Sequence, residues 1–168
     1  MRQKNLAHLE QNKLNQAYPA LAAAYRAADN STMKKITSAS LLASNEFVDF
    51  YHGADGSPER FAVADLSEEE KSLYGVQSDI LWLSRKSLDE HKDRHPEVTF
   101  EDYARIPDIV LNGAVWGGHS PRRYILLMVD GQSYRAAIKS DAKGLEAWFL
   151  SLVISGKQKP PKGAVRLR

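Results

Sequence analysis

The chain has no cysteine, so it can form neither a disulfide nor a thiolate zinc site, and any metal would need histidine, aspartate or glutamate ligands. It has no apolar run near the ~20 residues that span a membrane, and the N-terminal stretch MRQKNLAHLEQNK lacks the apolar centre of a signal peptide. No phosphate-binding glycine motif and no nucleophile-elbow serine motif occurs. These absences favour a protein made in the cytosol, with no membrane partner and no bound cofactor.

The composition is that of a folded protein. Of the 168 residues, 43% are hydrophobic and 26% are charged, close to the average for globular chains. The net charge is only +2, but the C-terminal stretch KQKPPKGAVRLR carries cations and no acid. These cations are Lys157, Lys159, Lys162, Arg166 and Arg168. Such a tail can attract phosphate, although a solvated, flexible end is the commoner outcome.

Local signals predict several helices. Residues 1–28 place apolar side chains at roughly helical spacing. Ser67 and Glu70 form a capping-box pattern before a short helix. Ser84 follows the apolar run ILWL, which has strand character, and can cap a helix that stops at His95 because Pro96 disfavours helical geometry in the residue before it. A further helix is expected from residue 99 to residue 112.

The C-terminal half predicts strands. The segments 123–129, 133–139 and 145–155 are apolar and alternating, and residues 114–116 can add an edge strand. Asp130-Gly131 between the first two segments is a strong hairpin signal, because both residues tolerate positive φ. The predicted fold is therefore α+β, with N-terminal helices followed by a four-stranded antiparallel sheet.

Strand alternation assigns side chains of the hairpin to two faces. One face should carry Ser133, Arg135 and Lys139 together with Tyr124, Leu126 and Met128, while the opposite apolar face packs on the helices. Arg135 and Lys139 could hold a phosphate between them. The simpler alternative is that these cations keep a solvent-facing strand soluble.

The stretch LDEHKDRHPE places His91 and His95 four residues apart on a predicted helix, in line with Leu88. Both rings should face inward or into a cleft. A metal site is disfavoured because Lys92 stands where the H-E-x-x-H pattern of metalloproteases has its glutamate. On spacing alone, packing and hydrogen bonding are the commonest roles, and an acid or base role is the alternative. His119, in GGHSPRR, is interpreted as a turn residue.

The order of these motifs resembles that of the phage-associated branch of the barnase, EndoU, colicin and RelE-like (BECR) nuclease superfamily. The motifs are ILWLSRKSLDEHKDRHPE, FEDYARIPDIVLN, RRYILLMV, SYRAAIK and WFLSLVIS, within residues 80–155. The resemblance implies a nuclease domain over residues 76–156. The chain departs from the family pattern in carrying an N-terminal helical segment of its own over residues 1–75, and the basic C-terminal tail covers residues 157–168. The resemblance also implies a four-stranded sheet with RNA bound on its open face.

The resemblance further implies metal-independent cleavage of RNA by attack of the ribose 2'-hydroxyl on the adjacent phosphate. His91 or His95 would be base or acid, and Arg135 and Lys139 would stabilise the phosphate. Tyr124 and Ser151 would be supporting polar groups. Members of this kind are often encoded in prophages as toxins or effectors, so a phage head protein, a virion protein or an inhibitor is an expected partner besides RNA. A noncatalytic virion-associated or RNA-binding module is the competing hypothesis, and a histidine-based metal enzyme is a third.

Overall fold

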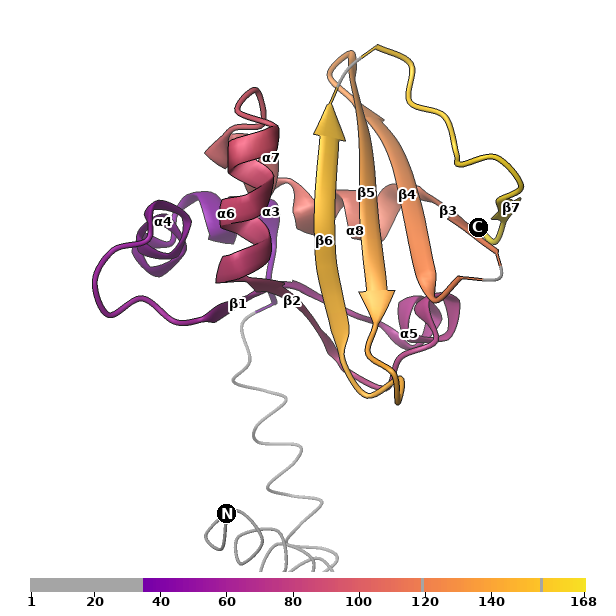
Figure 1. The fold of residues 1–168 in the computed structure, drawn as a ribbon, viewed down its shortest axis with the longest axis horizontal. Coiled ribbons are helices and arrows are strands. Elements are labelled where there is room, and N and C mark those ends of the chain that lie inside the picture. Colours follow the sequence, from indigo (N-terminus) through magenta and orange to yellow (C-terminus); the bar gives the residue numbers. More distant parts are fainter. Residues whose placement is uncertain (1–34, 119, 155) are drawn as a thin grey trace, which may run out of the picture. The chain divides into compact units, whose positions relative to one another are not determined.

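The computed structural model describes residues 35–118, 120–154 and 156–168. Its centre is a seven-stranded mixed sheet (Figure 1). In spatial order the strands are β1 (Arg60–Asp65), β2 (Ile80–Ser84), β6 (Ala147–Ile154), β5 (Gln132–Ser140), β4 (Arg122–Val129), β3 (Ala114–Gly117) and β7 (Val165–Arg166). All neighbouring strands are antiparallel except β2 and β6, which are parallel.

Along the described chain, all of the helices precede β3. The helices are α3 (Ser38–Leu42), α4 (Asn45–His52), α5 (Glu68–Tyr74), α6 (Arg85–Arg94), α7 (Phe100–Ala104) and α8 (Ile106–Asn112). The capping box predicted at Ser67 and Glu70 is confirmed, and Gly75 ends α5 with a φ of 68°, a conformation that glycine adopts without steric cost. Helix α6 begins after Ser84 and ends before His95, as predicted.

The prediction of N-terminal helices followed by a four-stranded antiparallel sheet is wrong. The sheet contains β1 and β2 in addition, and β2 joins it through a parallel pairing of Leu81 with Ala147. Strand β7 pairs with β3, so β3 is not an edge strand. Pairings between segments so far apart in sequence leave no local pattern, whereas the hairpin turn does. The helix predicted over residues 1–28 lies outside the described residues.

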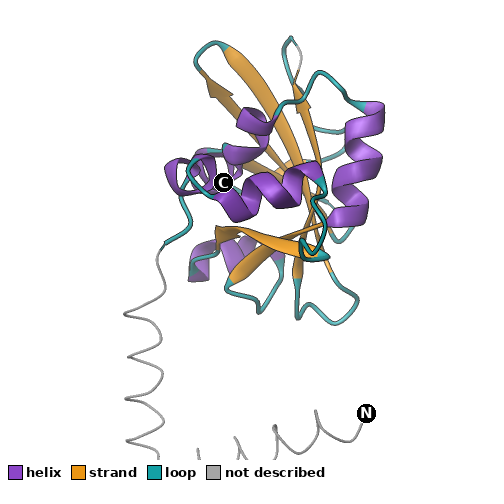
Figure 2. Cartoon of the chain, turned by 90° about the vertical axis from the view of Figure 1, so that its left-hand side faces the viewer, coloured by secondary structure: helices purple, strands orange, loops and turns teal. Residues whose placement is uncertain are grey.

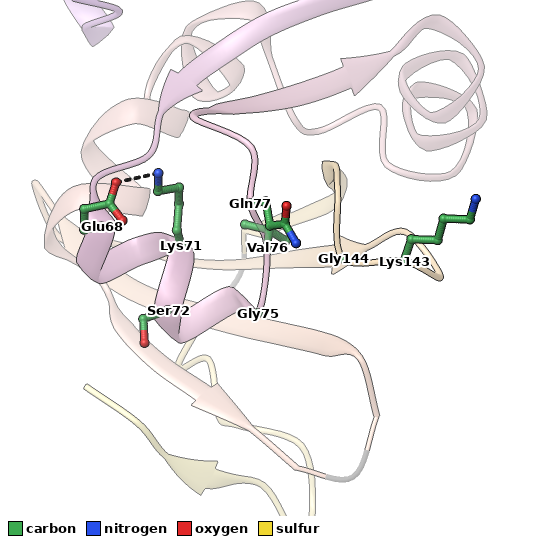
Figure 3. A pocket seen from close by; sticks show the side chains of 8 residues that line it. All are labelled: Glu68, Lys71, Ser72, Gly75, Val76, Gln77, Lys143 and Gly144. Atoms are coloured by element: carbon green, nitrogen blue, oxygen red, sulfur yellow. Dashed lines mark ion pairs between the residues drawn. The ribbon is translucent and has the colours of Figure 1, made fainter. Parts of the chain in front are cut away.

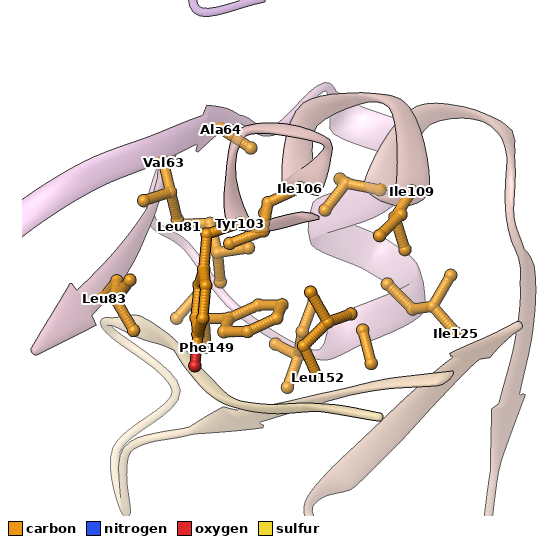
Figure 4. Packing of buried hydrophobic residues seen from close by; sticks show 14 of the residues in the cluster. Val63, Ala64, Leu81, Leu83, Tyr103, Ile106, Ile109, Ile125, Phe149 and Leu152 are labelled. Atoms are coloured by element: carbon orange, nitrogen blue, oxygen red, sulfur yellow. The ribbon is translucent and has the colours of Figure 1, made fainter. Parts of the chain in front are cut away.

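The hairpin formed by β4 and β5 is confirmed. Asp130 and Gly131 form its turn with φ values of 50° and 76°. The pairs Leu126–Arg135 and Met128–Ser133 lie directly opposite one another, so the predicted sharing of faces is also confirmed. On the other face Ile125, Ala136 and Ile138 are buried in the core, where Phe149 and Leu152 from β6 join residues of α7 and α8 (Figure 4).

The core defines two faces of the sheet. Helix α8 passes behind strands β4 to β6 in Figure 1, and the side view in Figure 2 shows the helices packed along the strands. We call the side of the sheet that points away from the hydrophobic core the outer face. In β5 this face carries Arg135 and Lys139, which alternate with the buried Ala136 and Ile138.

The C-terminal segment is held on the sheet and is not a loose end. The backbone N–H of Gln158 donates to Ser133 Oγ at 3.2 Å, and Arg135 donates to the carbonyl of Lys159 at 3.4 Å. After β7, the guanidinium of Arg168 donates to the Glu70 carboxylate at 2.9 Å and to the carbonyl of Val110 at 2.7 Å. The expected flexible tail is therefore anchored at both of its ends.

Gly113, between α8 and β3, offers a test of how closely α8 packs against β4. A Cβ atom there would lie 2.2 Å from Ile125 Cγ2 and 2.6 Å from the carbonyl oxygen of Ile109. Because the φ of Gly113 is −75°, alanine meets no backbone strain and the cost is steric alone. We expect Gly113→Ala to lower the free energy of unfolding by about 1–3 kcal/mol in urea denaturation.

Gly118→Ala is the matched control, since no atom lies within 4 Å of its added Cβ. Its unfolding midpoint should stay at the parent value. Equal midpoints for both variants would show that α8 does not approach β4 as closely as the structure has it.

Candidate functional site

His91 lies on α6, where it is only 3% exposed. The helix starts because Ser84 accepts a hydrogen bond from the N–H of Ser87, and Leu88 then anchors the same face of the helix in the core. One turn after Leu88, the His91 ring enters the layer between α6 and α7. The inward orientation predicted for this histidine is confirmed.

Both ring nitrogens of His91 take part in hydrogen bonds. The backbone N–H of Leu152 donates to Nε2 at 3.2 Å, so this nitrogen is the unprotonated one. Nδ1 then carries the proton and donates to the hydroxyl oxygen of Tyr103 at 2.5 Å. Strand β2 pairs with β6 only as far as Phe149, and α6 follows β2 directly. His91 therefore supplies Leu152 with the acceptor that a longer β2 would have provided.

The environment of His91 keeps its ring neutral. Burial, with a smaller contribution from the nearby His95 and Arg94, lowers its pKa to about 4 against the opposing effect of Glu97. A general acid or base works best with a pKa near the working pH. With both nitrogens bonded inside the protein and a low pKa, His91 has the properties of a structural residue.

His95 is the more accessible histidine. Its ring stacks on His91 with centroids 4.7 Å apart, and its side chain is 35% exposed. The carboxylate of Glu97 lies 3.1 Å from His95 Nδ1. The pKa of Glu97 is lowered, first by a backbone hydrogen bond and then by the bond to His95. A carboxylate beside one ring nitrogen orients an imidazole, so His95 has the better geometry for acid–base chemistry.

Lys92, between the two histidines, contacts Tyr51 of α4. Its Nζ donates to the carbonyl of Tyr51 at 2.8 Å and lies 4.3 Å from the centroid of that ring. Within the described residues, no three histidine, aspartate or glutamate side chains come together as a set of metal ligands.

The outer face of the sheet carries the other predicted site residues. Tyr124, Ala137 and Ser151 pair in sequence across β4, β5 and β6, so Tyr124 and Ser151 share this face with Arg135 and Lys139. Lys139 is exposed and Arg135 is partly exposed. His91 lies on the core side, where it contacts Tyr103 and Leu152. The structure thus brings four of the six predicted residues to one face and separates His91 from them.

A row of four side chains crosses the outer face and was missed from the sequence. It runs over β2, β6, β5 and β4 through the direct pairs Trp82–Trp148, Trp148–Lys139 and Lys139–Arg122. Neighbouring strands are about 4.8 Å apart, so the row spans roughly 14 Å. Both tryptophans are partly exposed and both cations are exposed. We call this set the aromatic–cationic row.

Trp148 escaped the sequence prediction for a specific reason. The register between β5 and β6 shifts because Ala137 pairs with Ser151 and Ile138 pairs with Phe149, which leaves Leu150 as an extra residue. A bulge of this kind inverts the alternation of side chains on one side of it. Simple alternation along residues 145–155 would instead place Trp148 and Ser151 on different faces. The sequence did hold one signal of this row: a tryptophan in each of the apolar segments 80–83 and 145–155.

A separate cavity of about 500 Å³ lies at α5 and the turn between β5 and β6 (Figure 3). Its lining includes Lys71, Ser72, Gln77 and Lys143. Lys71 forms ion pairs with Glu68 and Asp79, so its charge is already balanced. No predicted site residue lines this cavity. His119 and Ser155 are outside the described residues.

Comparisons with known proteins identify no relative from which a function could be inferred. No protein-family model matches the chain, and no curated protein matches it either. In the part of the chain that the structure describes, no helix is long and apolar enough to cross a membrane.

The lowered pKa of His91 predicts a pH dependence of stability. The unfolded state binds a proton near pH 6.5, whereas the folded state resists protonation down to about pH 4. Stability is therefore fully present above about pH 6.5 and falls as the pH drops toward 4, by about 3 kcal/mol for this residue. Urea denaturation of the parent at about pH 7 and about pH 4.5 should show this loss.

His91→Gln separates this effect from other titrating groups, since the amide can still accept from Leu152 but does not titrate. The variant should be less stable than the parent at neutral pH, and its stability should fall by about 2 kcal/mol less between the two pH values. An unchanged pH dependence would contradict a neutral, buried His91.

Proposed function

We propose that this protein is a noncatalytic module that binds single-stranded RNA on the outer face of its sheet. The observation that carries the proposal is the aromatic–cationic row, in which two tryptophans and two cations stand side by side across four strands. Proteins that bind single strands combine aromatic side chains, on which bases stack, with cations that follow the phosphates.

The charge of the outer face agrees with an anionic ligand. None of its positions in β4, β5 and β6 is an aspartate or glutamate, whereas Arg122, Arg135 and Lys139 are all there. The C-terminal segment that attaches to this face through Ser133 and Arg135 adds three further lysines, at positions 157, 159 and 162. Phosphate contacts by such groups supply the sequence-independent part of nucleic-acid affinity.

Binding is favoured over cleavage because His91 is buried and neutral and has both ring nitrogens engaged. The resemblance of the motifs to phage-associated nucleases still makes RNA the first ligand to test, and a virion protein the first protein partner. Cleavage is a second candidate on one observation, the pairing of the partly exposed His95 with Glu97.

Lys139→Ala and Arg122→Ala test the binding site. Each should weaken binding of a labelled single-stranded RNA, measured by fluorescence anisotropy over a series of salt concentrations. Because each removes one phosphate contact, the slope of log affinity against log salt should become shallower by about 0.7. Thermal melting should be unchanged, since both side chains are exposed.

Lys86→Ala is the matched control, because Lys86 is an exposed cation on α6 with a side chain 85% exposed. It should bind RNA like the parent. The proposed interface would be wrong if Lys139→Ala and Arg122→Ala behaved like this control.

Incubation of the parent and His95→Ala with RNA in excess chelator distinguishes binding from cleavage. We expect intact RNA in both samples. Products with cyclic phosphate ends that appear with the parent and disappear with His95→Ala would instead establish the metal-independent nuclease, with His95 as its acid or base.

A further inference from the structure

Trp82 and Trp148 occupy one end of the aromatic–cationic row as direct cross-strand neighbours. Arg60 reaches them from β1. Its guanidinium carbon lies 4.3 Å from the centroid of Trp82 and 5.9 Å from that of Trp148. The cation therefore stacks closely over Trp82 and lies farther from the Trp148 ring, so the two rings are not equivalent.

Besides these ring contacts, Arg60 pairs with one carboxylate among the described residues. Its Nη1 donates to the carboxylate of Glu146 at 2.9 Å, and the two side chains are 46% and 41% exposed. This bond uses one of the five N–H groups of a planar guanidinium. The fork is thus oriented by Glu146 while remaining open to solvent, and such a fork can donate to the carbonyl and ring-nitrogen acceptors of a nucleobase.

The cations next to Trp148 suit the phosphate of a nucleotide. On the side away from Trp82, the cross-strand partner of Trp148 is Lys139, and Arg122 follows. A base above Trp148 would have its edge toward Arg60 and its phosphate toward these two cations. Bases in a duplex are stacked on both sides and paired at their edges, so only an unpaired base can occupy such a place.

From this arrangement we propose that Trp148 is the stacking platform of a subsite for one unpaired nucleobase, and that Arg60, positioned by Glu146, binds the edge of that base. The inference rests on the proposed RNA binding and deepens it, because it assigns base contacts to β1 and β6 and phosphate contacts to β4 and β5. The proposed ligand is a single strand that carries bases, and a polyanion without bases does not fill this subsite.

The test compares two labelled strands of equal length and charge, an oligouridylate RNA and its abasic counterpart, on the full chain. Uridine offers two carbonyl acceptors and forms little structure of its own. The parent should bind oligouridylate about 5- to 100-fold more tightly than the abasic strand, the factor that corresponds to stacking of one base.

Substitutions at Trp148 separate stacking from folding. Trp148→Leu keeps an apolar side chain without an aromatic face, and should bind both strands with the affinity that the parent has for the abasic one. Trp148→Phe keeps an aromatic face and should retain most of the preference. Arg60→Lys keeps the charge but loses the fork, so it should weaken oligouridylate binding several-fold and leave abasic binding unchanged.

Salt-sensitive binding with equal affinity for both strands, or a Trp148→Leu protein with the parent's preference, would overturn the subsite and leave the proposed RNA binding intact. Absence of binding to either strand at low salt would overturn the RNA-binding proposal itself, and the subsite with it.

Discussion

The parallel pairing of β2 with β6 is the contact on which the rest of the structure depends. It joins the β1–β2 unit to the meander of β3 to β6, and it places Leu81 and Leu83 beside Ala147 and Phe149, all of them buried. Because the pairing ends at Phe149, the remaining edge of β6 would expose backbone groups to the helix layer. His91 resolves this by accepting the N–H of Leu152.

The same constraint explains why the two neighbouring histidines lie in different environments. The side chain that replaces a missing strand must be buried and must remain an acceptor, which requires a neutral ring. Burial lowers the pKa of His91 and secures that state. His95, one turn later at the end of α6, stacks on this ring and stays partly in solvent. One imidazole is therefore fixed in its neutral state by burial and hydrogen bonds, while the other remains accessible to solvent.

The parallel pairing also assembles the aromatic–cationic row. Trp82 belongs to β2, and it meets Trp148, Lys139 and Arg122 only because β2 lies against β6. Ser133 and Arg135 tie the C-terminal segment to this face, and after β7 Arg168 forms an ion pair with the buried Glu70 of α5. Arg135 thereby contributes to anchoring the segment, besides adding charge to the face.

Short-range patterns are enough to predict the local elements: the Asp130-Gly131 turn, the Ser67 capping box, the bounds of α6, and the common face of Tyr124, Arg135 and Lys139. Each of these follows from interactions within a few residues or from strand alternation. The seven-stranded order, the neutral state of His91 and the pairing of Trp82 with Trp148 arise from contacts made in the folded chain. The reason is physical: a parallel pairing, a bulge and a buried environment depend on segments distant in sequence, and no short-range pattern specifies which segments will meet.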